Sequence, residues 1–196
     1  MVDADDVAAV LIERLGGMTA MKLEKLVYYC QSWHLARHGI PLFHEEIEAW
    51  AQGPVVRRLF DQHRQSYHVR AWTAGDPLAL RVEERATVEW VIDKYGALSA
   101  ERLSRMTHAE APWRVARAGL PDGVPSNAPI SQELMGSYYA RQCADTEGAV
   151  TSAVASAALE GVELDADWQG RLHEVASGVI EADALVADEI SRIRRR

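Results

Sequence analysis

The stretch TAMKLEKLVYYCQSWHLARHG, Thr19 to Gly39, has the clearest helical pattern of the chain and decides the fold class. Apolar residues recur in it at spacings of three and four, which is the period of one helix face. These residues are Leu23, Leu26, Val27, Cys30 and Trp33. Thr19 suits an N-cap and Gly39 suits a C-terminal stop. We therefore predict a long helix here, with Cys30 as a small apolar side chain on its buried face.

The same period predicts further helices on both sides of this stretch, so we expect a mainly α fold. They cover Asp6–Leu15, residues 53–65 with Pro54 in the first turn, residues 83–96, residues 99–113 capped by Ser99, and residues 132–142 capped by Ser131. An alternating pattern near residues 44–51 and a turn-rich stretch at 67–82 predict a small β element.

The composition of the chain changes after Cys143. The segment ADTEGAV, residues 144–150, is small and polar, which indicates a linker or a helix start. Three short helices are predicted beyond it, at Val150–Glu160, Asp167–Ser177 and Glu181 to about Arg194, with Asp165 and Gly178 at the two ends of the second. We predict a main domain at residues 1–145 and a three-helix tail at 146–196. A unit of about fifty residues buries little apolar surface, so the tail should depend on the main domain or on another protein.

The composition of the chain argues against several classes of binding partner and against a secreted or membrane protein. The chain has 196 residues and a net charge of -8, which argues against nucleic acid or an anionic membrane as the main partner. The acidic N-terminus lacks the order of a signal peptide, and no apolar run approaches the length of a membrane span. Two cysteines cannot form a disulfide framework. We expect a cytoplasmic protein.

Candidate chemistry is sparse. His34 and His38 stand four apart, but Leu35 occupies the place where a zinc helix needs glutamate. His44 is followed by two glutamates, and only the fold could complete a site there. We expect polar surface and helix-end histidines, with no metal and no cofactor. No phosphate-binding loop or nucleophile elbow is present, so an enzyme is the weaker class.

The segment SAALEG, residues 156–161, sets a hydroxyl and a carboxylate four residues apart. On a helix, Ser156 and Glu160 share one face, and Gly161 is suited to end that helix. From the pattern alone, Glu160 is equally well a solvated glutamate on an ordinary helix.

The segment MKLEKLVYYCQSWHLARHGIPLFHEEIEAWAQGPVVRRLF strongly resembles the opening of the Panacea domain, the family that includes the SocA-type antitoxins. A later segment, YGALSAERLSRMTHAEAPW, matches as well, and the likeness covers residues 1 to about 142. The resemblance implies a mostly helical antitoxin domain that neutralises a toxin encoded beside it; some relatives instead deliver the toxin to a protease. We expect the matching positions to be structural: Lys22, Leu23, Leu26, Trp33, Trp50, Gly53, Pro54 and Trp113.

The tail is similar to the small VbhA-type antitoxins, which inhibit Fic-domain toxins. Their signature is Ser or Thr, three residues, Glu, then Gly or Asn, and Ser156, Glu160 and Gly161 fit it. The acidic turn VELDAD and the segment Ser177–Ile180 follow in matching order, whereas Glu181 departs from the usual Ser or Thr cap. The resemblance implies a hetero-oligomer with a Fic toxin. In it the glutamate pairs with the arginine that holds the γ-phosphate of ATP, and AMP transfer stops.

Three alternatives stay open. The chain could be a Panacea antitoxin that neutralises a different toxin, or a proteolytic adaptor that hands such a toxin to a cellular protease. In both cases the tail would be structural. It could repress its own operon, which the acidic charge argues against. It could also be a metal-dependent enzyme, which bound zinc in the purified protein would support.

Overall fold

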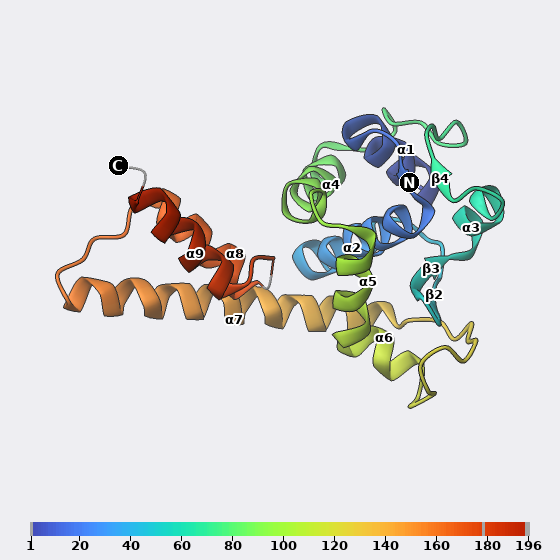
Figure 1. The fold of residues 1–196 in the computed structure, drawn as a ribbon. Helices are drawn as coiled ribbons and strands as arrows, with labels where there is room; N and C mark the ends of the chain where they lie inside the picture. Colours follow the sequence, from blue (N-terminus) through green and yellow to red (C-terminus); the bar gives the residue numbers. More distant parts are fainter. Residues whose placement is uncertain (1, 178, 195–196) are drawn as a thin grey trace. The chain divides into compact units, whose positions relative to one another are not determined.

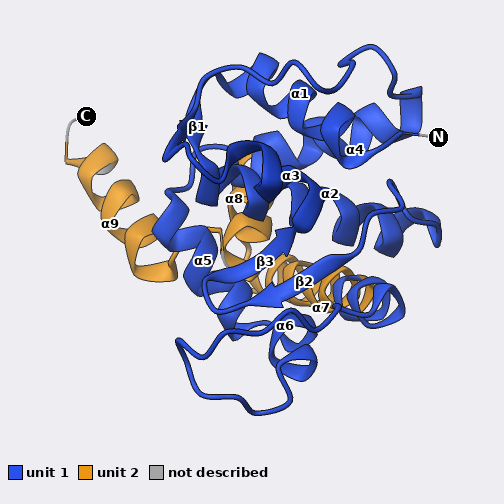
Figure 2. Cartoon of the chain, turned by 90° about the vertical axis from the view of Figure 1, so that its right-hand side faces the viewer, with its two compact units in different colours: residues 1–139 blue, residues 140–196 orange. Residues whose placement is uncertain are grey.

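The computed structural model describes residues 2–177 and 179–194 (Figure 1). The predicted helix stop at Gly178 lies outside the described residues. The described part is mainly helical with two small antiparallel sheets, which confirms the predicted fold class. The chain divides into two compact units, residues 1–139 and residues 140–196 (Figure 2).

The first unit is built around one central helix. Its elements are α1 (Ala4–Leu15), β1 (Met18–Thr19), α2 (Ala20–His38), β2 (Ile47–Trp50), β3 (Gly53–Val56), α3 (Arg57–His63), β4 (His68–Val69), α4 (Val82–Tyr95), α5 (Ala100–Ala109), α6 (Ala111–Ala116) and the beginning of α7 (Gln132–Leu159). Helix α2 packs against α1, α4, α5 and β3, and the core of the unit lies around it.

Helix α2 begins and ends where its sequence predicts. The Thr19 side chain accepts a hydrogen bond from the Lys22 N–H, and Gly39 takes the left-handed conformation at the other end. Cys30 is fully buried, and burial raises the pKa of its thiol. Burial extends further than one apolar face, however, because every residue from 23 to 35 is buried, polar ones included. The helix is therefore surrounded on all sides rather than lying on a surface.

The two sheets are a short pair, β1 with β4, and a hairpin, β2 with β3. One strand of each sheet, β2 and β4, lies inside the segments predicted to hold a β element, whereas β1 and β3 lie outside them. The prediction that Pro54 stands in the first turn of a helix is wrong: Pro54 belongs to β3, opposite Ala49, and α3 starts at Arg57. Ala49 directs its N–H away from β3, to the Ala128 carbonyl at 2.8 Å. The pairing of β2 with β3 therefore needs no N–H at position 54, which is why proline is tolerated there.

Helix α7 is longer than predicted. Ser131 caps its start by accepting the Leu134 N–H at 3.2 Å, as predicted. The segment 144–150, predicted as a linker or a helix start, continues the same helix without a break. It contains no proline, and alanines compensate for its single glycine, so helical propensity is sufficient to carry the backbone through. The predicted domain boundary between residues 145 and 146 thus falls within a helix.

The second unit consists of the remainder of α7, α8 (Ala166–Ala176) and α9 (Ala182–Ile193). Asp165 caps α8 by accepting the Trp168 N–H at 2.9 Å, as predicted, and no side chain caps α9 at Glu181. Arg171 on α8 pairs with Asp188 and Glu189 on α9, at 3.6 and 3.8 Å. Among residues of this unit whose exposure the structure describes, only Val150 is buried. The unit has almost no core of its own.

Candidate functional site

Four of the positions singled out in the first unit, Trp50, Gly53, Pro54 and Trp113, lie in the β2–β3 hairpin or bond to it. Its outward carbonyls accept hydrogen bonds from side chains of the surrounding helices. Lys25 Nζ donates to the Pro54 carbonyl at 2.9 Å, and Trp113 Nε1 donates to the Trp50 carbonyl at 2.9 Å. Arg117, itself buried, donates to the Ala49 carbonyl at 3.2 Å. We call this set, Lys25, Trp113 and Arg117 on the hairpin carbonyls, the hairpin clamp.

Helix α2 also closes the free edge of the hairpin. The Glu24 carboxylate accepts the Val56 N–H at 2.9 Å and lies 2.6 Å from His63 Nε2. Lys25, the next residue, is fully buried, and this burial lowers the pKa of its ammonium to about 8, with the Glu24 charge opposing the shift. Two adjacent charged side chains of one helix thereby satisfy the edge of β3 that would otherwise be open.

Gly53 is required by both its backbone and its surroundings. Its φ is +106°, and a Cβ there would lie 2.6 Å from Lys25 Cε and 3.1 Å from Thr107 Oγ1. We expect Gly53→Ala to reduce the free energy of unfolding by about 2 kcal/mol, because it adds backbone strain and displaces the Lys25 side chain. Chemical denaturation measures this loss.

Gly119→Ala is the matched control for that substitution. Gly119 also has a positive φ, +78°, but a Cβ there would meet nothing within 4 Å. The control therefore isolates backbone strain from crowding. Equal losses in the two variants would show that the Lys25 contact does not constrain Gly53.

The other singled-out positions of the first unit lie in its core or at its edge. Leu23 and Leu26 are fully buried, and Trp33 donates from Nε1 to the Tyr95 hydroxyl at 3.0 Å. Lys22 donates from Nζ to the Gly96 carbonyl at 2.6 Å. Each of these contacts joins α2 to another part of the same unit.

A buried carboxylate that the sequence analysis missed lies beside this core. Glu110, between α5 and α6, accepts hydrogen bonds from the hydroxyls of Tyr139, Tyr29 and Tyr28, at 2.5, 3.0 and 3.4 Å. Burial raises the pKa of Glu110 to about 7, against the opposing effect of the three hydroxyls. The two tyrosine pairs in the sequence were the available signal. Nothing in the local pattern of HAEAPW, however, shows that its glutamate is buried.

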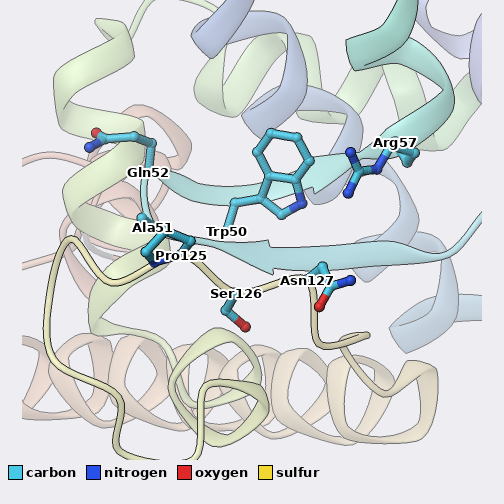
Figure 3. Close-up of a pocket in the computed structure, with 7 residues that line it drawn as sticks. All are labelled: Trp50, Ala51, Gln52, Arg57, Pro125, Ser126 and Asn127. Atoms are coloured by element: carbon cyan, nitrogen blue, oxygen red, sulfur yellow. The ribbon is translucent and has the colours of Figure 1, made fainter.

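A surface pocket of about 540 Å³ opens on the hairpin side that carries Trp50 (Figure 3). Its lining is Trp50, Ala51, Gln52, Arg57, Pro125, Ser126 and Asn127. The Arg57 guanidinium lies 4.7 Å from the centre of the Trp50 ring and pairs with Glu48 at 3.1 Å. These seven residues include no acid, histidine or cysteine, so they do not assemble a nucleophile and base.

The histidines differ from the prediction of surface and helix-end positions in one case. His34 is buried, and its Nδ1 lies 3.0 Å from the Thr87 hydroxyl. Burial, together with the smaller effect of the neighbouring His38, lowers the pKa of His34 to about 4. Within residues 2–177 and 179–194, no group of three or more His, Cys, Asp or Glu side chains is arranged to hold a metal ion. No helix in the same residues is long and apolar enough to cross a membrane.

The SAALEG segment forms the end of α7. Its backbone closes as a Schellman motif, in which the Val162 N–H bonds to the Ala157 carbonyl at 2.9 Å and the Gly161 N–H to the Ala158 carbonyl at 3.0 Å. Gly161 takes a φ of +78°, so it ends the helix as predicted. Ser156 and Glu160 are both exposed, and the Glu160 carboxylate has no hydrogen bond or ion pair to any residue that the structure describes.

Comparison with known proteins bears on the first unit. Residues 23–114 match the family model described as antitoxin SocA-like, Panacea domain. This segment is similar to SocA-like Panacea domains. A curated relative, antitoxin SocA of Caulobacter vibrioides (strain NA1000 / CB15N), is 29% identical, and the match covers 60% of this chain and 72% of that protein. No solved structure matches the chain significantly.

The Panacea match includes most of the hairpin clamp. Two of its three donors, Lys25 and Trp113, fall inside residues 23–114, and Arg117 follows three residues after the end of that range. The sequence prediction of a Panacea domain is thereby confirmed for this range. The tail lies wholly outside the family match, so its resemblance to Fic-inhibiting antitoxins stays a prediction.

Proposed function

We propose that this protein is an antitoxin, not an enzyme, which acts in the cytoplasm as a hetero-oligomer with a Fic-domain toxin. In the complex, Glu160 pairs with the toxin arginine that holds the γ-phosphate of ATP, and AMP transfer stops. The antitoxin class follows from the Panacea domain and its SocA relative. The Fic toxin follows from the resemblance of residues 146–196 to the small Fic-inhibiting antitoxins.

One observation carries the proposal: Glu160 is an exposed carboxylate with no partner within the described part of the chain, fixed at a defined helix end. A carboxylate can occupy the place of a phosphate oxygen against a guanidinium, where it makes short, charge-assisted hydrogen bonds. The end of a helix is also its negative pole, so an unpaired carboxylate there is disfavoured until a cation approaches. Pairing with an arginine relieves that repulsion.

The very small core of the second unit supports the same proposal. Exposed apolar side chains occur on its helices and loop, among them Leu159, Val162, Val186 and Ile190. A helical unit of this size normally needs further apolar contacts to be stable. A toxin surface that covers these side chains would supply them.

The test is AMP transfer by the Fic-domain protein encoded beside this chain, measured with and without this protein. We expect one equivalent of the full chain to stop transfer of labelled AMP, in purified components and without any protease. Unchanged transfer at saturating concentration would overturn the proposal.

A second candidate function is a proteolytic adaptor, or a Panacea antitoxin against a different toxin. The observation that favours it is the extent of the family match, which ends at residue 114 and excludes the tail. Under this alternative, neutralisation needs a cellular protease or a toxin of other chemistry. The same assay separates the two functions, because an adaptor leaves the purified toxin active until the protease is added.

A further inference from the structure

We propose that the loop from Leu159 to Glu163, which we call the LEGVE loop, docks into the toxin as a unit in which Glu160 has two helpers. Leu159 and Val162 enter an apolar part of the nucleotide pocket, and Glu163 lies beside a second cation of that pocket. This inference rests on the proposed function and adds to it the residues that hold the complex together.

The apolar side chains of the LEGVE loop are unusually exposed. Leu159 is 91% exposed and Val162 is 50% exposed. In a Schellman motif, the residue in the position of Val162 commonly packs back on the third or fourth residue from the helix end. Here those residues are Ala157 and Ser156, which offer little apolar surface. Both side chains are therefore available to a partner.

The backbone of the loop is fixed even though its side chains are free. The Schellman bonds hold Gly161 and Val162, and the Glu160 N–H bonds to the Ala157 carbonyl at 3.1 Å. A Cβ on Gly161 would meet nothing within 4 Å, so no other part of the described chain covers the turn. A loop that is already ordered loses little conformational entropy when it binds, which favours affinity.

The stretch of sequence that contains the LEGVE loop has charged residues of one sign. No Lys, Arg or His occurs between Arg141 and Arg171, whereas six acidic residues do. Asp165 is used as the α8 cap and Asp167 lies 3.5 Å from Arg171. Glu163 and Glu160 have no partner among the described residues. Two free carboxylates between two exposed apolar side chains complement a pocket that holds a nucleoside triphosphate, since such a pocket needs cations for the phosphates and apolar walls for the base.

The first experiment measures the affinity of full-length variants for the Fic-domain protein by titration calorimetry. We expect Leu159→Ser to weaken binding about 30-fold, which corresponds to the loss of one buried leucine side chain. At saturating concentration the variant should still block AMP transfer, because Glu160 is intact. Leu78→Ser is the matched control, since Leu78 is 82% exposed and lies in the first unit. We expect that variant to bind as the wild type does.

The second experiment measures association rates at several salt concentrations. We expect Glu163→Gln to slow association about threefold at low salt and to reduce its salt dependence, because the loop then attracts the basic pocket less strongly. Glu13→Gln, which removes an exposed carboxylate of the first unit, is the control and should change neither quantity.

The outcomes distinguish this inference from the function on which it rests. If Leu159→Ser and Glu163→Gln both bind as the wild type does while Glu160→Gly relieves the block, the docking role is wrong and the proposed function stands. If the wild-type chain neither binds nor inhibits the Fic-domain protein, both are overturned. Weakened binding with an intact block at saturation supports the docking role.

Discussion

Glu160→Gly is expected to restore AMP transfer by the bound toxin to the level of the free toxin, while the complex itself stays intact. The physical reason is that one carboxylate blocks the γ-phosphate position, whereas the interface involves the surrounding helices and the exposed Leu159. Labelled AMP transfer by the purified complex measures the block, and size-exclusion chromatography of the same sample measures the complex. A variant complex that still blocks transfer as the wild type does would contradict the assignment.

Two further variants sharpen this result. Glu160→Gln keeps the shape of the side chain and removes its charge, so it should also release the toxin if the pairing is electrostatic. Glu163→Gly removes a carboxylate three residues away and should leave the block in place at saturation. Release by both glycine variants would indicate that the loop conformation, rather than the Glu160 charge, is responsible.

The second large effect concerns the buried Glu110 and pH. Burial raises the pKa of Glu110 to about 7, whereas the unfolded chain has the ordinary value of 4.5. Between these values the folded protein holds a proton that the unfolded chain has released, so the free energy of unfolding falls as pH rises. At 1.36 kcal/mol for each unit of pKa, we expect this one group to lower stability by about 3 kcal/mol from pH 4.5 to above pH 7.

Comparison with Glu110→Gln isolates this effect. The amide oxygen can still accept hydrogen bonds from the tyrosine hydroxyls, but it does not titrate. Burial lowers the pKa of His34 to about 4, so this group makes the free energy of unfolding rise with pH. It does so equally in both proteins and therefore cancels in the difference between them. Urea denaturation from pH 4.5 to 8 should show the wild type losing stability relative to the variant. Parallel curves would mean that Glu110 does not hold a proton in the folded state.

Local sequence signals predicted the ends of most helices. Thr19, Ser99, Ser131 and Asp165 each cap the helix that follows, because a side-chain oxygen can bond the free N–H groups of the first turn. Gly161 ends α7 for the same local reason, since it takes a positive φ without strain. This part of the candidate site could therefore be derived from six residues.

The errors arose where distant residues decide the structure. Pro54 lies in a strand because Lys25 and the loop at Ala128, both distant in sequence, bond to the hairpin in which Pro54 pairs with Ala49. His34 is buried because α4 covers it through Thr87, 53 residues further along the chain. The hydrogen bonds of Glu110 reach 81 residues back to Tyr29. A periodic pattern carries no information about such partners.

The hairpin clamp has a consequence for the order in which the first unit folds. Two four-residue strands are marginal by themselves, and the clamp donors are 29, 63 and 68 residues away from the carbonyls they bond. The hairpin can lock only after α2 and α6 have assembled, which places its contacts on the native side of the folding transition state. A defect such as Gly53→Ala should therefore accelerate unfolding and leave the rate of folding nearly unchanged.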